Sequence, residues 1–222
     1  GHYAGDAWVE RLRWLYPRLA TNLCTISALR PVPEIVQRLN EFRPTILIGY
    51  PTAVAVLARE QLAGRLRISP ALAATGGECL DTSDRGLIQD AFRCLVRDAY
   101  NSSEFMGIAF DCGRGWLHVN SDWAILEPVD GSYRPVPPGQ PSHTVLLTNL
   151  ANRVQPLIRY DLGDSVTVSP DPCPCGSPMP AIRVEGRRDD ILYFPGRGSQ
   201  MVPVLPMAIC AVVEETPGVQ VY

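Results

Sequence analysis

The sequence predicts an α/β protein in which a parallel sheet with crossover helices is followed by an antiparallel β subdomain and by the start of a small α+β C-terminal region. Up to residue 100, short apolar runs alternate with longer helical segments in the order β-α-β-α-β, which is the pattern of a parallel sheet. After residue 100, short strand-like runs follow one another between turns. The tail, residues 191–222, is too short to form a domain by itself.

The helices are predicted from apolar spacing and from their boundary residues. In residues 6–16, Trp8, Leu12 and Leu15 share one helical face, and Pro17 ends the segment. Further helices are expected over 33–42, over 51–65, from an N-cap at Thr82 or Ser83 to about residue 93, and over 204–215.

The strands are predicted from short apolar runs between these segments. The run 45–49 is typical of a buried parallel strand, and 71–74 and 95–100 are its expected neighbours. The antiparallel strands are expected at 116–120, 123–128, 144–149, 165–169 and 181–185, with a loop at 130–140.

The composition excludes some chemistry. All 20 basic residues are arginine, so the chain can form no lysine Schiff base and has no P-loop lysine. The net charge of −3 argues against a nucleic-acid or anionic-membrane surface. Because the sequence has neither an apolar run of about 18 residues nor a signal-peptide pattern at its start, we expect a cytoplasmic protein with reduced cysteines.

Three segments follow the predicted parallel strands at their carboxyl ends, where open parallel sheets bind ligands. They are Gly49-Tyr50-Pro51, Thr75-Gly76-Gly77-Glu78 and Tyr100-Asn101-Ser102-Ser103-Glu104. A glycine pair lets another group approach the backbone closely. A carboxylate after a serine turn can hold a metal ion or a sugar hydroxyl. These segments are therefore the candidate ligand site.

Four motifs in order carry a resemblance to a known family. After residues 75–78 and 100–104 come Arg159-Tyr160-Asp161-Leu162-Gly163-Asp164 and Gly186-Arg187-Arg188-Asp189-Asp190. Together they resemble the adenylate-forming (ANL-type) superfamily, whose members activate a carboxylate with ATP. Leu147-Thr148-Asn149-Leu150 and Gln155-Pro156-Leu157-Ile158-Arg159-Tyr160 are most similar to the phenylacetate–CoA ligase branch, which includes CapK-like proteins.

The resemblance implies a site for ATP or AMP with Mg²⁺. Glu104 would help to bind Mg²⁺, and Ser103 would face the α-phosphate or the substrate carboxylate. Asp164 would accept hydrogen bonds from both ribose hydroxyls, and Asp189 would be the hinge of a C-terminal lid. The other implied nucleotide contacts are Gly76, Gly77, Glu78, Tyr100 (stacked on adenine), Asn101, Ser102 and Arg187, and the implied acyl pocket is Tyr50, Pro51, Ala74, Phe105 and Met106.

Asn101 departs from the family pattern, since relatives usually carry glycine after the tyrosine. Asparagine is the non-glycine residue that best tolerates a left-handed turn. We therefore expect the turn to be kept and the pocket to be narrower.

By the same resemblance, residues 1–185 would be the second half of the large adenylation domain, with a βαβ part at 30–110 and a β subdomain at 111–185. Residues 186–222 would be the hinge and the beginning of the lid. The Ser/Thr/Gly-rich phosphate loop and the C-terminal catalytic lysine of such enzymes have no counterpart here. We therefore expect a piece of a longer enzyme, which by itself binds adenosine nucleotides weakly and does not catalyse adenylation at a useful rate.

The implied activity is ATP-dependent activation of a carboxylic acid, aryl or arylacetic, as its acyl-adenylate, followed by thioester formation with coenzyme A. Two alternatives stay open. One is transfer of the acyl group to a carrier protein or an amine, and the other is a degenerate nucleotide-binding or partner module without catalysis. A homodimer through residues 1–30 also stays open.

A second constellation contains Cys112, His118, Cys173 and Cys175. Three thiols and one imidazole suit tetrahedral zinc with no open position, which would make the site structural. Reduced free cysteines and a disulfide are the alternatives, although neighbouring Cys-X-Cys residues rarely pair with each other because the ring is strained.

Overall fold

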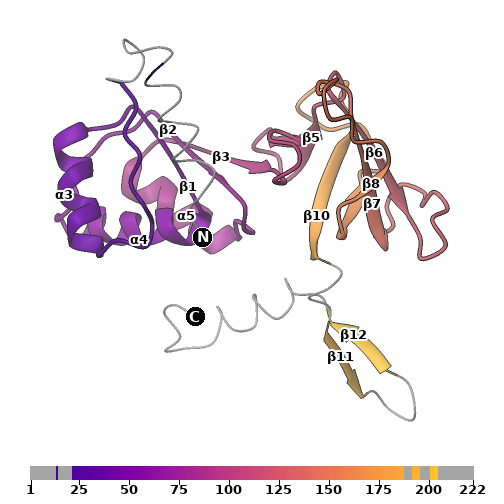
Figure 1. The fold of residues 1–222 in the computed structure, drawn as a ribbon. Coiled ribbons are helices and arrows are strands. Elements are labelled where there is room, and N and C mark those ends of the chain that lie inside the picture. The colour runs from indigo at the N-terminus through magenta and orange to yellow at the C-terminus, as the bar shows by residue number, and fades with distance from the viewer. Residues whose placement is uncertain (1–13, 15–21, 188–191, 196–200, 205–222) are drawn as a thin grey trace.

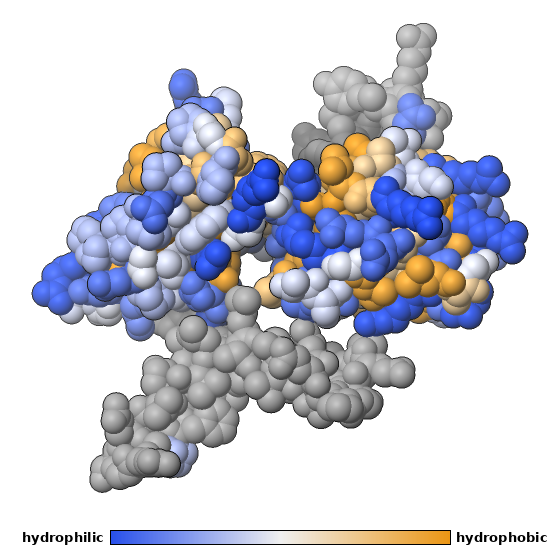
Figure 2. Space-filling model, turned by 180° about the vertical axis from the view of Figure 1, so that it is seen from behind, coloured by the Kyte–Doolittle hydropathy of each residue, from blue (hydrophilic) through white to orange (hydrophobic). Residues whose placement is uncertain are grey.

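The computed structural model describes residues 14, 22–187, 192–195 and 201–204. The main sheet has seven strands in the order β1-β2-β3-β4-β5-β10-β9, and a second sheet has three in the order β6-β7-β8. Figure 1 shows the helices with β1–β3 on one side and the antiparallel strands on the other. Figure 2 shows the same two lobes from behind, joined by a narrow waist. The predicted α/β class is confirmed.

The described part of the first lobe contains three parallel strands and three helices. The strands are β1 (Ile46–Gly49), β2 (Leu72–Gly76) and β3 (Leu95–Tyr100), and the helices are α3 (Val32–Phe42), α4 (Pro51–Leu62) and α5 (Thr82–Phe92). This is the predicted β-α-β-α-β order. Leu47, Ala73 and Val96 lie in one apolar core with residues of all three helices.

The described helices α3, α4 and α5 pack on one face of these strands. On the opposite face, Ile46, Ile48 and Leu95 are 53%, 77% and 59% exposed. The prediction that residues 45–49 form a buried strand is therefore wrong for that face. Alternation explains this result, because successive side chains of a strand point to opposite sides and only Leu47 points towards the helices.

Helix α5 begins differently from the prediction. The carboxylate of Asp81 accepts a hydrogen bond of 2.7 Å from the backbone amide of Asp84, which makes Asp81 the N-cap. The prediction of a cap at Thr82 or Ser83 is wrong, since both lie inside the helix. Aspartate is at least as good an N-cap as serine or threonine, so the chain starts the helix at the first suitable residue.

The second lobe shares the main sheet. β4 (Ala109–Asp111), β5 (Leu117–Val119), β10 (Ala181–Arg187) and β9 (Asp164–Val168) continue it in antiparallel fashion, and β6 (Ala124–Val129), β7 (Thr144–Asn149) and β8 (Tyr160–Asp161) form the second sheet. A second apolar core includes Val145 and Leu147 of β7 with Val166 and Ile182 of the main sheet. The antiparallel region is therefore continuous with the parallel one through β3 and β4.

At the C-terminal end, β11 (Leu192–Pro195) and β12 (Met201–Val204) pair antiparallel. The predicted helices at 6–16 and 204–215 lie outside the described residues apart from Trp14 and Val204, and Asp189 and most of residues 1–30 also lie outside them. Within the described part of the chain, no helix combines the length and the apolar character needed to cross a membrane.

Candidate functional site

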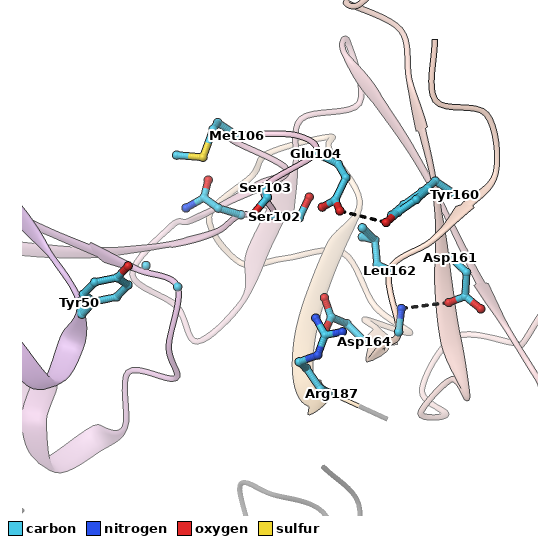
Figure 3. Close-up of a pocket in the computed structure, with 14 residues that line it drawn as sticks. Tyr50, Ser102, Ser103, Glu104, Met106, Tyr160, Asp161, Leu162, Asp164 and Arg187 are labelled. Carbon is cyan, nitrogen blue, oxygen red and sulfur yellow. Dashed lines mark hydrogen bonds and ion pairs between the residues drawn. The ribbon is translucent and has the colours of Figure 1, made fainter. Parts of the chain in front are cut away.

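A pocket lies where the carboxyl ends of β2 and β3 face the turn between β8 and β9 (Figure 3). Its volume of about 680 Å³ falls within the range of small-molecule sites, about 300–1,000 Å³. The lining residues are Tyr50, Gly76, Gly77, Asn101, Ser102, Ser103, Glu104, Met106, Tyr160, Asp161, Leu162, Gly163, Asp164 and Arg187.

The structure brings ten of the predicted site residues into this lining. Those that do not line it, among the described residues, are Pro51, Ala74, Glu78, Tyr100 and Phe105. Four lining residues, 160–163, have no role in the expectations above. These four residues belong to the motif 159–164, in which a nucleotide contact is expected of Asp164 alone. The motif was therefore the sequence signal that could have identified them.

The glycine pair allows two side chains to approach the backbone closely. Gly77 has a φ of +85°, and a Cβ atom on it would lie 2.9 Å from Cε1 of Tyr50. A Cβ atom on Gly76 would lie 2.9 Å from Nδ2 of Asn101. A side chain at either position would therefore displace Tyr50 or Asn101 from the pocket wall.

Glu78 ties the glycine turn to helix α4. Its Oε2 accepts hydrogen bonds from the backbone amide of Thr52 at 3.3 Å and from Oγ1 of Thr52 at 2.7 Å. Thr52 lies in the first turn of α4, where free amides and the helix dipole attract a carboxylate. This contact accounts for the absence of Glu78 from the pocket lining.

Asp164 is a buried carboxylate with two protein partners. The hydroxyl of Tyr100 donates to Oδ2 at 2.6 Å, and Nη1 of Arg187 lies 3.7 Å from Oδ1. Burial raises the pKa of Asp164, and the Tyr100 hydrogen bond and the Arg187 charge oppose that effect. Burial and the Asp164 charge raise the pKa of Tyr100, so its hydroxyl stays a donor. Because a carboxylate has about four acceptor positions, Asp164 keeps capacity for the hydroxyls of a ligand.

Glu104 lies in the loop after β3 and faces Tyr160 of β8 in Figure 3. The Tyr160 hydroxyl donates to Oε1 at 3.0 Å. The backbone amide of Glu104, first, and then Tyr160 lower the pKa of the Glu104 carboxyl. A carboxyl that stays ionised is a suitable ligand for a hard divalent cation.

Asn101 does not have the predicted backbone conformation. The described non-glycine residues with positive φ are Arg43, Arg93, Tyr133 and Arg159, so the expected left-handed turn at Asn101 is wrong. The side chain has another role. Oδ1 of Asn101 accepts a hydrogen bond of 2.7 Å from the Gly107 amide, and Nδ2 donates to the Ala99 carbonyl at 3.3 Å. Asn101 thus closes the loop that carries Ser103 and Glu104.

The lining is rich in negative charge. It contains the carboxylates of Glu104, Asp161 and Asp164 and, among the described residues, the single guanidinium of Arg187. A polyphosphate in this pocket would therefore need additional positive charge, which a divalent cation can supply.

The second constellation also comes together. Ligand atoms of Cys112, His118, Cys173 and Cys175 all lie within 4.8 Å of one another. The Cys112 and Cys173 sulfur atoms are 3.7 Å apart, and Nε2 of His118 is 3.2 Å from the Cys175 sulfur. A tetrahedral zinc ion with Zn–S bonds of about 2.3 Å places two sulfurs about 3.8 Å apart, whereas a disulfide needs about 2.05 Å. The spacing fits an ion and not a disulfide.

The orientation of His118 agrees with a ligand role. Its Nδ1 lies 3.0 Å from the Met179 carbonyl oxygen, which can only accept a hydrogen bond. Nδ1 therefore carries the proton, and Nε2 presents its lone pair to the thiols. In metal sites, the histidine ring nitrogen that does not bind the metal usually donates a hydrogen bond to an acceptor of this kind.

Comparisons with known proteins point to one superfamily. The chain is 28% identical over 200 residues to protein CapK of Staphylococcus aureus, with 85% of this chain and 42% of the relative covered. It is 26% identical over 189 residues to phenylacetate–coenzyme A ligase of Thermus thermophilus, with 81% and 42% covered. A crystal structure of 2-hydroxyisobutyryl-CoA ligase with its acyl-AMP and CoA aligns with a TM-score of 0.67 at 26% identity, over 84% of this chain and 45% of that one.

The comparisons support an adenylate-forming superfamily for this chain. The two curated relatives are the kinds of protein that the motifs resembled, so the expected phenylacetate–CoA ligase and CapK-like branch is confirmed. The chain spans 42% of the length of each curated relative. No protein-family model matches it.

Proposed function

We propose that the pocket binds the adenosine nucleotide of a ligase that activates a carboxylic acid. In this reaction a carboxylate oxygen attacks the α-phosphorus of ATP, pyrophosphate leaves, and the acyl-adenylate then passes its acyl group to the thiol of coenzyme A as AMP leaves. The observation that carries the proposal is Asp164, a buried carboxylate held between Tyr100 and Arg187 at one side of the pocket. Support comes from relatives named as CoA ligases.

The residues take roles according to their chemistry. Asp164 accepts both ribose hydroxyls, and Arg187 contacts the ribose or a phosphate. Gly76, Gly77, Asn101 and Ser102 form the adenine side. Tyr100 is given a different role from the stacking expected from the resemblance: it holds Asp164 in place, since its hydroxyl lies on that carboxylate and its ring is not among the described lining residues.

Ser103 and Glu104 face the reacting groups in this proposal. Ser103 would contact the α-phosphate or the substrate carboxylate. The negative lining and the lowered pKa of Glu104 fit a Mg²⁺ ion at Glu104, which supplies charge neutralisation for the phosphates when it is bound. Tyr50 and Met106, which both line the pocket, form the acyl end, and their apolar surfaces suit an aryl or arylacetic acid.

Two further parts complete the proposal. Residues 1–185 belong to the large adenylation domain, and 186–222 to a hinge and lid with Asp189 as the pivot. Cys112, His118, Cys173 and Cys175 hold a structural zinc ion, which joins the turn after β4 to the knuckle before β10. Transfer to a carrier protein or an amine is the competing outcome for the second half-reaction, and acceptor assays on the enzyme distinguish it from thioester formation.

The test is calorimetric titration of the 222-residue chain with AMP and with ATP–Mg²⁺, using GMP as the comparison. We expect AMP to bind more tightly than GMP, and Asp164→Ala to weaken AMP binding by about tenfold, since it removes hydrogen bonds to a charged group. The same preparation should not exchange pyrophosphate into ATP at a useful rate, because it has no lysine. Equal binding of AMP and GMP, or no effect of Asp164→Ala, would contradict the proposal.

A further inference from the structure

Tyr160 connects the two sheets within the lining of the pocket. It lies on β8 of the three-stranded sheet, whereas Glu104 lies in the loop after β3 of the main sheet. The 3.0 Å hydrogen bond between the Tyr160 hydroxyl and Oε1 of Glu104 therefore joins the two sheets in the pocket lining (Figure 3). The two residues are 56 positions apart in the chain, so their contact is made by the fold and not by a local turn.

The backbone of the Glu104 loop is held without Tyr160. The Gly107 amide donates to Oδ1 of Asn101 at 2.7 Å. The Phe105 amide donates to Oγ of Ser102 at 3.1 Å, and the Ser102 amide donates to the Phe105 carbonyl at 3.1 Å. These three bonds fix the backbone on both sides of Glu104. The Glu104 side chain also contacts its own backbone amide and Ser102, and Tyr160 adds to these restraints a hydrogen bond that comes from the other sheet.

The contact also leaves the carboxylate able to bind a cation. A phenol hydroxyl donates one hydrogen bond, and an ionised carboxylate has about four acceptor positions on its two oxygens. With Oε1 held by Tyr160, Oε2 has a defined direction. A carboxylate whose orientation is set before the ligand arrives binds a cation with a smaller loss of conformational entropy.

We propose that Tyr160 is a positioning residue that orients Glu104 for the divalent cation of a bound nucleotide. The inference rests on the proposed nucleotide function of the pocket. It assigns a role to a residue to which the sequence motifs gave none. It also predicts a specific defect: loss of the hydroxyl weakens the metal-dependent part of binding and leaves the metal-independent part unchanged.

The experiment compares the unmodified chain with Tyr160→Phe. Calorimetry measures the affinity for ATP over a series of Mg²⁺ concentrations, and the affinity for AMP in the presence of a chelator. We expect Tyr160→Phe to raise the Mg²⁺ concentration needed for half-maximal ATP binding by about tenfold, as for other residues that orient a metal ligand. The affinity for AMP without metal should be unchanged.

Tyr133→Phe is the matched control. It also removes one phenol hydroxyl that donates to a carboxylate, at 3.0 Å from Oδ2 of Asp161, but Tyr133 is not a lining residue. In the Tyr133→Phe variant, the dependence of ATP binding on Mg²⁺ concentration should equal that of the unmodified chain. In a Glu104→Gln background, Tyr160→Phe should have no further effect on the Mg²⁺ dependence, because the carboxylate that it orients is gone.

The outcomes separate this inference from the proposed function. If AMP and ATP bind and Tyr160→Phe leaves the Mg²⁺ dependence unchanged, the inference is overturned and the nucleotide site stands. Equal weakening of AMP and of ATP–Mg²⁺ also overturns it, since that result indicates a structural role. If the unmodified chain binds no adenosine nucleotide, the proposed function fails, and the role of Tyr160 fails with it.

Discussion

Asp164 is held in an environment that opposes its own charge. It is 8% exposed, and burial raises the pKa of its carboxyl above the ordinary 3.8. Below that ordinary value the carboxyl is protonated in both the folded and the unfolded chain, and no penalty arises. As the pH rises from that value through the raised pKa, the unfolded chain loses this proton more readily than the folded chain, so ionisation of Asp164 destabilises the fold. A residue kept under these conditions is a candidate for ligand binding.

Asp164→Asn should therefore separate stability from binding. The amide oxygen still accepts the Tyr100 hydrogen bond, and the buried charge is removed. We expect an unfolding temperature at pH 7 that is equal to or higher than that of the unmodified chain, together with weaker AMP binding. The gain in stability should disappear as the pH is lowered through the raised pKa towards the ordinary value of 3.8, because the carboxyl is then protonated in both the folded and the unfolded chain. Thermal denaturation across this pH range measures it, and a gain that grows on acidification would contradict the argument.

At the residue scale, the sequence predicted most of the pocket lining but not the contacts within it. Motif order identifies Asp164 and Glu104 as neighbours of one ligand. It does not indicate that Tyr100 and Tyr160 hold these two carboxylates, since each pair joins residues more than 50 positions apart, 64 for the first and 56 for the second. Asn101 shows the same limit, because its side chain was judged by its preference for a left-handed turn and instead closes a loop.

Helix α5 is connected to strand β4 by an ion pair that the pocket does not use. Nη2 of Arg85 lies 2.7 Å from Oδ2 of Asp111, and the contact is an ion pair without the alignment of a hydrogen bond. The Asp111 side chain is 3% exposed, and its Oδ1 accepts from the Gly113 amide beside Cys112. Arg85 thus links the helical layer of the first lobe to the turn that carries the first cysteine of the proposed zinc site.

Arg85→Met should destabilise the chain by about 3 kcal/mol, because it leaves a buried carboxylate without its partner charge. Arg30→Met is the matched control. Its ion pair with Glu34 has side chains that are 51% and 53% exposed, so its loss should change the free energy of unfolding by less than about 1 kcal/mol. Chemical denaturation measures both values. Equal effects of the two substitutions would show that the Arg85–Asp111 pair contributes no more than a surface pair.

At the element scale, length decided what could be predicted. The helices and the strands β1–β3 have apolar patterns of four or more residues, and each was anticipated within a few residues of its boundaries. β4 has three residues and β8 has two, and both exist because a partner strand pairs with them. Pairing of this kind has no local pattern. The sequence therefore did not show that the antiparallel strands continue the parallel sheet.

At the scale of the whole molecule, the described residues form two apolar cores joined by one sheet, and the proposed zinc site lies in the second lobe near the junction. Removal of the metal with a chelator should lower the unfolding temperature, by about 2–4 °C for each kcal/mol of binding energy lost in a domain of this size. Cys173→Ser should behave like the metal-free chain. Metal analysis of the purified protein provides the direct measurement, and a zinc-to-protein ratio near zero with reduced thiols would refute the site.

The two separate cores have a consequence for how the molecule opens. Strand β3 contributes to both cores, Val96 to the first and Tyr100 to the second, whereas the other core residues come from different elements. We expect each core to open partly without the other, so that backbone amides in the two lobes exchange hydrogen with different protection.

The pocket takes Gly76 and Gly77 from one lobe, and Tyr160 and Asp164 from the other. A ligand that fills it would bind only when both lobes are closed. Its binding energy would then couple the local opening of the two lobes. The difference in amide hydrogen exchange between the lobes should therefore become smaller when the ligand is bound.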